Sequence, residues 1–155
     1  MGGVIEFELV RTVDAQIGEV FERLAEIDGY RDWMPKRGSL LRHTKQTSPG
    51  PVGVGTTYVD QMSVGTSPGE VIEFDSPTTL VFHWWDASSG GKVKVEGWPG
   101  YRLEASGPRT TIVHHHARMA AYGIHRLMTP LYRRMALRER TVVIEALQRS
   151  FARPA

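Results

Sequence analysis

The sequence predicts an α+β fold in which a curved, antiparallel, seven-stranded sheet wraps around a long C-terminal helix, with two short helices after the first strand. Three observations support this fold class. Residues 4–13 alternate between apolar and polar, residues 39–120 consist of short apolar runs separated by glycine and proline, and residues 130–152 carry apolar side chains at helical spacing. Strands and helices are therefore segregated along the chain, as is typical of α+β proteins.

The first strand is expected over 4–13. Its alternation gives one buried face, formed by Ile5, Phe7, Leu9 and Val13. Asp14 occupies an N-cap position before a helix predicted over 15–26. A second short helix is predicted over 28–35, where Pro35 ends it because the residue before a proline avoids helical angles.

Six further strands are predicted between residues 39 and 120, where β-branched and aromatic residues are frequent and glycine and proline recur at short intervals. Ser67-Pro68-Gly69 is interpreted as a hairpin turn between two of them. Short strands joined by such turns favour an antiparallel meander. The expected strands cover 39–47, 55–65, 69–75, 79–86, 92–104 and 109–120.

The last segment predicts a long helix over 130–152, and residues 122–128 are expected to add a helical turn before it. Thr129 is placed at the N-cap and Pro130 at the first helical position, where the missing N–H of proline costs nothing. A helix that lies across a strongly curved sheet either fills the enclosed space or covers it. At about 100° per residue, one broad apolar sector contains Leu131, Tyr132, Met135, Val142, Val143, Ala146 and Leu147.

One domain covering residues 1–155 is expected, because the sequence shows no repeat, low-complexity tract or linker. The absence of cysteine excludes a disulfide scaffold, a thiolate nucleophile and a cysteine-ligated metal. A formal charge of +2 gives no indication of a nucleic-acid partner. No apolar run approaches the ~18 residues of a membrane span, and no secretory leader is recognised. A cytoplasmic location without stable membrane insertion is therefore expected.

Six short motifs occur in an order that is typical of a known fold. They are Asp14-Ala15 with Val20-Phe21, Tyr30-Arg-Asp-Trp33-Met-Pro35, Gly53-Val-Gly55-Thr56, the segment 71–82 with Glu73, Pro77 and Leu80, Gly107-Pro-Arg-Thr110, and Thr129-Pro130-Leu131. In this order they resemble the START-like SRPBCC superfamily, and specifically its polyketide cyclase/dehydrase-type branch, whose fold is the helix-grip fold. The resemblance covers residues 4–150. These motifs are signals of turns and packing, so they specify the fold better than the chemistry.

The resemblance implies an internal apolar cavity between the curved sheet and the C-terminal helix. Members of the superfamily bind a lipid, polyketide, sterol, quinone or similar molecule there, and some catalyse cyclisation or dehydration. The expected function is therefore the binding of a small hydrophobic ligand, with no cofactor implied. The alternative is a polyketide aromatase/cyclase-type enzyme that uses acid and base side chains of the cavity. A third interpretation is an interaction domain with a filled core.

Most residues expected to face such a cavity are aromatic and lie on predicted strands or helices. Core packing would also explain the large apolar residues among them, and composition does not separate the two interpretations. The candidates for ligand binding are Trp33, Tyr58, Asp60, Phe82, Trp84, Trp98, His114, His116, Tyr132, Met135 and Glu139.

Four of these candidates could transfer protons. Glu139 falls in the apolar sector of the long helix, where a carboxylate needs water, a ligand or a cation; alternatively, it reaches solvent or an arginine. Asp60 shares a strand face with Tyr58. His114 and His116 share one face of their strand and His115 the other, but the sequence leaves open which face points inward.

Three further patterns carry less weight. Gly65-Thr-Ser67-Pro-Gly69 matches a nucleophile elbow, but Pro68 offers no N–H for an oxyanion hole and a strand follows it. The consecutive histidines lack a third ligand, so no metal site is predicted. The arginines of 126–140 are interpreted as a solvated helix face, with contact to a membrane surface or an acidic partner as the alternative.

Overall fold

The computed structural model describes residues 3–152, so both ends of the domain predicted over 1–155 lie outside the described residues. The predicted α+β fold is confirmed, and η1 and η2 are short 3-10 helices. The elements follow in the order β1 (Val4–Val13), α1 (Ile17–Ala25), η1 (Ile27–Asp32), β2 (Leu41–Gln46), β3 (Thr57–Met62), β4 (Gly65–Asp75), β5 (Thr79–Ala87), β6 (Val93–Gly107), β7 (Thr110–Ala121), η2 (Gly123–Met128) and α2 (Thr129–Ser150).

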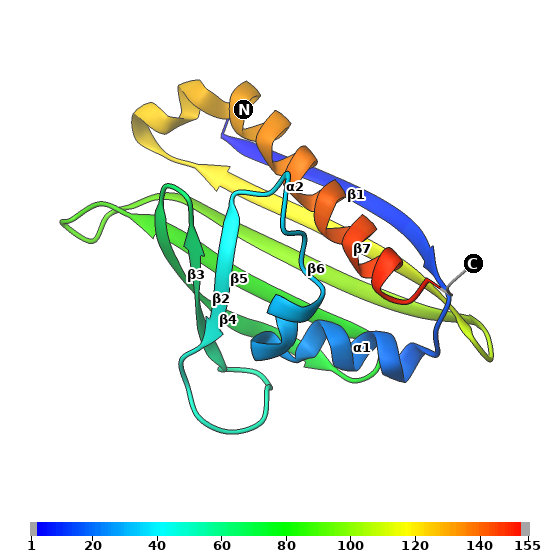
Figure 1. Cartoon of the computed structure of the whole chain (residues 1–155). Coiled ribbons are helices and arrows are strands. Elements are labelled where there is room, and N and C mark those ends of the chain that lie inside the picture. Colours follow the sequence, from blue (N-terminus) through cyan, green and yellow to red (C-terminus); the bar gives the residue numbers. More distant parts are fainter. Residues whose placement is uncertain (1–2, 153–155) are drawn as a thin grey trace.

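The strands form one antiparallel seven-stranded sheet in the order β1-β7-β6-β5-β4-β3-β2. Strands β2 to β7 follow one another as a meander, and β1 pairs with β7 and forms one edge of the sheet. The sheet is curved, with α1 and α2 on the same side of it and the connection from η1 to β2 running up toward α2 (Figure 1). This is the helix-grip architecture that the sequence predicts.

Burial of α2 changes halfway along the helix. Val143, Ile144, Ala146 and Leu147 in the C-terminal half are all buried. Ile144 and Leu147 join a core that α1 and the sheet complete with Phe21, Leu24, Leu103 and Val113, among others. No residue of α2 before Val143 is buried, and Leu131, Met135 and Leu137 are exposed. The helix therefore fills the enclosed space at one end only.

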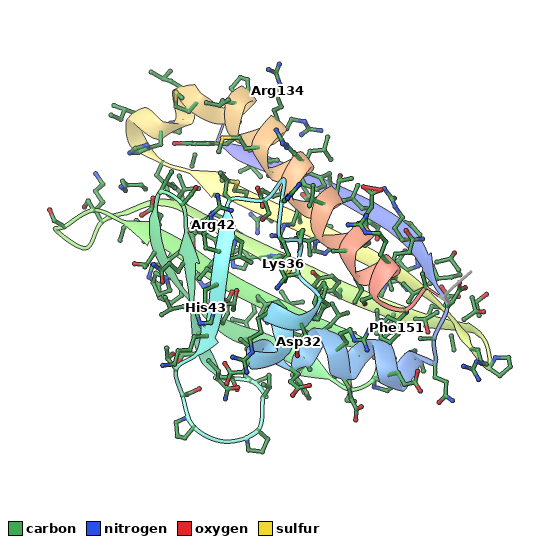
Figure 2. All side chains as sticks on the ribbon, viewed as in Figure 1. Asp32, Lys36, Arg42, His43, Arg134 and Phe151 are labelled. Atoms are coloured by element: carbon green, nitrogen blue, oxygen red, sulfur yellow. The ribbon has the colours of Figure 1, made fainter. Side chains whose placement is uncertain are left out.

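The C-terminal end of α2 is tied to its neighbours by polar contacts. Arg23 on α1 donates from Nη1 to the Ser150 carbonyl and hydroxyl oxygens, at 3.0 and 2.9 Å. The Arg23 guanidinium also lies 3.6 Å from the centre of the Phe151 ring, a side chain that lies beside α1 in Figure 2. Gln148 donates to the Thr12 carbonyl of β1 at 2.8 Å. These contacts fix the end of the helix that carries the core residues.

The interpretation of Ser67-Pro68-Gly69 as a hairpin turn is wrong. These residues lie inside β4, and the turn comes earlier, where Met62 and Gly65 pair across Ser63 and Val64. Pairing of β4 with β5 begins at Gly69, so Pro68 precedes the paired stretch on that side. A strand, not a helix, follows Ser67, which also removes the geometry of a nucleophile elbow.

Both predicted N-caps are wrong by one or two residues. Gln16 rather than Asp14 precedes α1, because the Thr111 hydroxyl donates to the Ala15 carbonyl at 2.8 Å and holds this connection against β7. Met128 rather than Thr129 precedes α2. The Thr129 hydroxyl donates to the Arg126 carbonyl at 2.6 Å, so the chain passes from η2 into α2 with Thr129 already helical.

Replacing Leu147 with alanine should lower the free energy of unfolding by about 2–5 kcal/mol, because a fully buried side chain leaves a cavity in the core. Leu137 provides a matched control on the same helix. It is 41% exposed, and its replacement by alanine should change stability by less than about 0.5 kcal/mol. Urea unfolding followed by circular dichroism measures both. Equal losses in the two variants would contradict the division of α2 into a buried and an exposed half.

Candidate functional site

A cavity of about 330 Å³ lies between the sheet and the N-terminal half of α2. The sheet supplies residues from β2 to β7, and η1 contributes Ile27 and Tyr30. The volume of the cavity lies at the lower end of the range of small-molecule pockets. The helix forms the roof with Tyr132, Met135, Ala136, Glu139 and Arg140.

Two aromatic rings form part of the cavity wall, each lying over a glycine of the neighbouring strand. Tyr58 on β3 pairs with Gly69 on β4, which pairs with Trp84 on β5, which in turn pairs with Gly97 on β6. A Cβ atom added to Gly69 would lie 2.3 Å from Tyr58 Cζ, and one added to Gly97 would lie 2.5 Å from Trp84 Cε2. The two glycines thus let the rings lie down on the sheet and leave the space above them open.

Asp60 brings a carboxylate to the wall. It lies directly opposite Thr44 in the pairing of β2 with β3, and its Oδ1 accepts a hydrogen bond from the Thr44 hydroxyl at 2.7 Å. Burial raises the pKa of Asp60, while the Thr44 hydrogen bond and the positive charge of Arg140 act in the opposite direction. A carboxyl group with a raised pKa in a cavity is suited to exchange a proton with a ligand.

Arg140 lines the same cavity and was not among the residues predicted from the sequence. Its positive charge counteracts the rise in pKa that burial causes in Tyr58 and Tyr101, both of which also line the cavity. Within residues 3–152, no carboxylate forms an ion pair with Arg140. Helical spacing offered a signal, because Arg140 precedes the buried Val143 and Ile144 by three and four positions.

Glu139 lines the cavity, but both of its carboxylate oxygens already have partners. Oε2 accepts a hydrogen bond from the Ser39 hydroxyl and Oε1 accepts one from the Leu40 N–H, each at 2.7 Å. The carboxylate therefore joins α2 to the connection between η1 and β2. The sequence left open whether Glu139 borders a cavity or reaches solvent or an arginine; the structure places it in the cavity wall, with Ser39 and Leu40 as its hydrogen-bond partners.

His114 and His116 do not line the cavity. Val113 is fully buried, which places the side chains of His114 and His116 on the outer face of β7. His114 lies 3.5 Å from both Glu8 and Glu104, and His116 lies 2.8 Å from Glu6. Within residues 3–152, histidines and carboxylates form no group of three or more that could hold a metal ion.

His115 occupies the inward face that the sequence left undecided. Its Nδ1 lies 2.8 Å from the Gly100 carbonyl, which can only accept, so Nδ1 carries the hydrogen. The ring stacks on Tyr101 with centroids 4.2 Å apart. Burial lowers the pKa of His115 to about 3, so a neutral imidazole backs the tyrosine of the cavity wall.

Trp33 and Trp98 also lie away from the cavity. Trp98 stacks on His83 with ring centroids 5.1 Å apart, and the Arg118 guanidinium lies 5.0 Å from the Trp98 ring. Trp33 packs edge-on against Tyr30 and borders a separate cleft, formed by Arg23, Glu26, Gly29, Asp32 and Ser150. Side chains alternate along β6, which places Trp98 on the face of the sheet opposite the cavity. Trp33 directly follows the last residue of η1 and faces the separate cleft.

The cavity thus brings together most, but not all, of the predicted residues. The structure adds Tyr30, Tyr101 and Arg140 to them, because these side chains converge only in the folded chain. The predicted residues that line the cavity are Tyr58, Asp60, Phe82, Trp84, Tyr132, Met135 and Glu139.

Comparison with known proteins shows similarity of fold at low sequence identity. No family model and no curated protein matches the chain. The Zhui aromatase/cyclase from Streptomyces sp. R1128 superposes with a TM-score of 0.75 at 13% identity, over 95% of this chain and 93% of that one. A START superfamily protein from Mycobacterium smegmatis gives a TM-score of 0.70 at 10% identity, over 97% of both chains.

A third solved structure, the di-domain ARO/CYC StfQ from the steffimycin biosynthetic pathway, gives a TM-score of 0.72 at 11% identity. The match covers 97% of this chain and 51% of StfQ, so the chain corresponds to about half of that protein. The chain therefore shares the helix-grip fold of these proteins. In addition, no helix of residues 3–152 combines the length and apolar character needed to cross a membrane.

Because the Tyr58 ring lies over Gly69, the stability cost of adding a side chain at position 69 should depend on the residue at position 58. Gly69→Ala should lower the free energy of unfolding by about 1–3 kcal/mol, because the new methyl group overlaps the far end of the Tyr58 ring. In a Tyr58→Leu background, which lacks those ring atoms, the same substitution should cost less than about 0.5 kcal/mol. A double-mutant cycle measured by urea unfolding tests this, and equal costs in both backgrounds would refute the contact.

The low pKa of His115 predicts a loss of stability in mild acid. Below about pH 6.5 the unfolded chain binds a proton at this histidine, whereas the folded chain does so only near pH 3. Between pH 7 and pH 5, the wild type should therefore lose about 2 kcal/mol of unfolding free energy relative to His115→Phe. Unfolding curves of both proteins across this range provide the measurement. Parallel pH profiles would show that the imidazole is not held neutral.

Proposed function

We propose that this chain binds a small, largely apolar molecule in the cavity beneath the N-terminal half of α2. One observation carries the proposal: the long helix packs into a core only from Val143 onward and leaves an aromatic-walled space of about 330 Å³ under its first half. An apolar ligand would gain about 25 cal/mol for each Å² that it removes from water there. Flat rings of Tyr58 and Trp84 favour a ligand with a planar ring system, such as a quinone or polyketide, over a flexible chain.

The polar side chains of the cavity would orient this ligand. Arg140 is a hydrogen-bond donor only, Asp60 accepts when ionised, and the hydroxyls of Tyr58 and Tyr101 do both. A carbonyl or phenolic oxygen directed toward Arg140 would therefore find a partner, as would a hydroxyl directed toward Asp60. As part of this proposal, the protein would be located in the cytoplasm, as expected from the sequence.

An aromatase/cyclase-type enzyme is the second candidate, favoured by the raised pKa of Asp60 in a cavity that also holds Arg140. Asp60 would exchange the proton, and the guanidinium would stabilise an oxygen on which negative charge develops. Glu139 is less suited to this role because Ser39 and Leu40 occupy its oxygens. His114 and His116 lie on the outer face of the sheet and do not reach this cavity.

Filling the cavity with a large side chain should weaken ligand binding. We expect 1,8-dihydroxyanthraquinone, a planar probe with polar oxygens, to quench the tryptophan fluorescence of the wild type in a saturable way. Ala136→Trp should weaken its affinity at least about tenfold, because residue 136 lines the roof and a large ring there takes the space of the ligand.

Leu137→Trp is the matched control, because it places the same ring one residue along α2 at an exposed position. It should change the affinity by less than about twofold. Saturable binding that survives Ala136→Trp would place the ligand elsewhere. A wild type that shows no saturable quenching by this probe would count against a planar aromatic ligand.

A further inference from the structure

Exposed apolar side chains form a stripe along η2 and the first half of α2. On the 3-10 helix η2, Ile124 and Leu127 lie three residues apart and share one side. On α2, Leu131 and Met135 lie four residues apart and also share one side. Two of them are almost fully in solvent, with Ile124 78% and Leu127 83% exposed. Single exposed apolar residues are common on protein surfaces, but a continuous row marks an interaction site. This apolar stripe consists of Ile124, Leu127, Met128, Leu131 and Met135.

The stripe borders the mouth of the cavity. Met135 belongs both to the stripe and to the cavity lining. Val64, at the tip of the turn between β3 and β4, lines the same cavity and is 83% exposed. The first half of α2 and the β3–β4 turn, which are far apart in the sequence, thus present exposed apolar side chains around one opening. A ligand that enters the cavity passes between them.

The charged side chains of the segment that carries the stripe all have one sign. Residues 122–138 contain four arginines and no aspartate or glutamate, in a chain whose net charge is only +2. Arg134 and Arg138 follow Leu131 by three and seven positions and therefore share its side of the helix. Figure 2 shows the Arg134 side chain pointing away from the body of the protein. The other two arginines are Arg126 and Arg133.

The charge distribution selects the partner. A second copy of the chain placed symmetrically on this surface would bring arginines against arginines, which opposes association. The surface of a bilayer with anionic lipids offers negative headgroups for the arginines and an acyl region for the apolar tips. A helical segment with an apolar stripe and arginines but no acids is suited to lie in that interface.

We propose that η2, the first half of α2 and the tip of the β3–β4 turn dock on the surface of an anionic lipid bilayer. The mouth of the cavity then faces the membrane, and an apolar ligand passes between bilayer and cavity without crossing bulk water. Docking is peripheral, since no helix of the described residues could span a bilayer. The surface does not depend on which ligand the cavity holds.

Co-sedimentation of the full chain with vesicles tests this proposal. We expect binding to vesicles of phosphatidylcholine with a third phosphatidylglycerol, little binding to phosphatidylcholine alone, and loss of binding in about 1 M salt, where charges are screened within about 3 Å. Replacing Ile124 and Leu127 together by aspartate should lower the partition coefficient at least about tenfold. Arg134→Ser and Arg138→Ser should each lower it about fivefold.

Matched controls lie on other surfaces of the protein. Val54→Asp changes a 68% exposed valine of the loop between β2 and β3, and Arg11→Ser removes an arginine of β1; neither should alter vesicle binding. A wild type that stays in the supernatant with anionic vesicles would overturn the proposal, as would full binding by the Ile124/Leu127 variant. A dimer in sedimentation velocity that this variant dissociates, without vesicle binding by the wild type, would identify a second copy as the partner instead.

Discussion

Burial of the last turns of α2 is the constraint on which the rest of the structure depends. Ile144 and Leu147 are enclosed by α1 and the sheet, and Arg23 and Gln148 hold the end of the helix by hydrogen bonds. Because this half is fixed, the first half can extend over the sheet without filling the space below it. A helix buried along its whole length would leave no cavity, and one without an anchored end would not cover it.

The open space is maintained by the sheet as much as by the helix. Gly69 and Gly97 lack the Cβ atoms that would lift Tyr58 and Trp84 off the sheet. Glu139 joins α2 to Ser39 and Leu40, so the connection before β2 closes one side of the roof. Tyr58, Trp84 and Glu139 thus maintain the shape of the cavity. Asp60 and Arg140 remain as the charged groups best placed to contact a ligand.

The first half of α2 has two surfaces with different tasks. Its inner side carries Ala136 and Arg140 into the cavity wall, and its outer side carries Leu131 with Arg134 and Arg138. Met135 belongs to both, so whatever covers the stripe also changes the entrance to the cavity. Ligand uptake and surface docking would therefore be coupled through a single helical segment that the core does not hold in place.

The order of elements, the alternation of the strands and the long terminal helix followed from the sequence, because periodicity is a local property that each segment carries by itself. Gly69 looked like part of a turn and is a strand residue, because its role is set by the Tyr58 ring on the adjacent strand. Arg140 was missed because only the fold brings it beside Asp60 and the tyrosines. Which histidines of β7 face inward was decided by pairing with β1 and β6, since a shift of one residue would exchange the two faces of the strand.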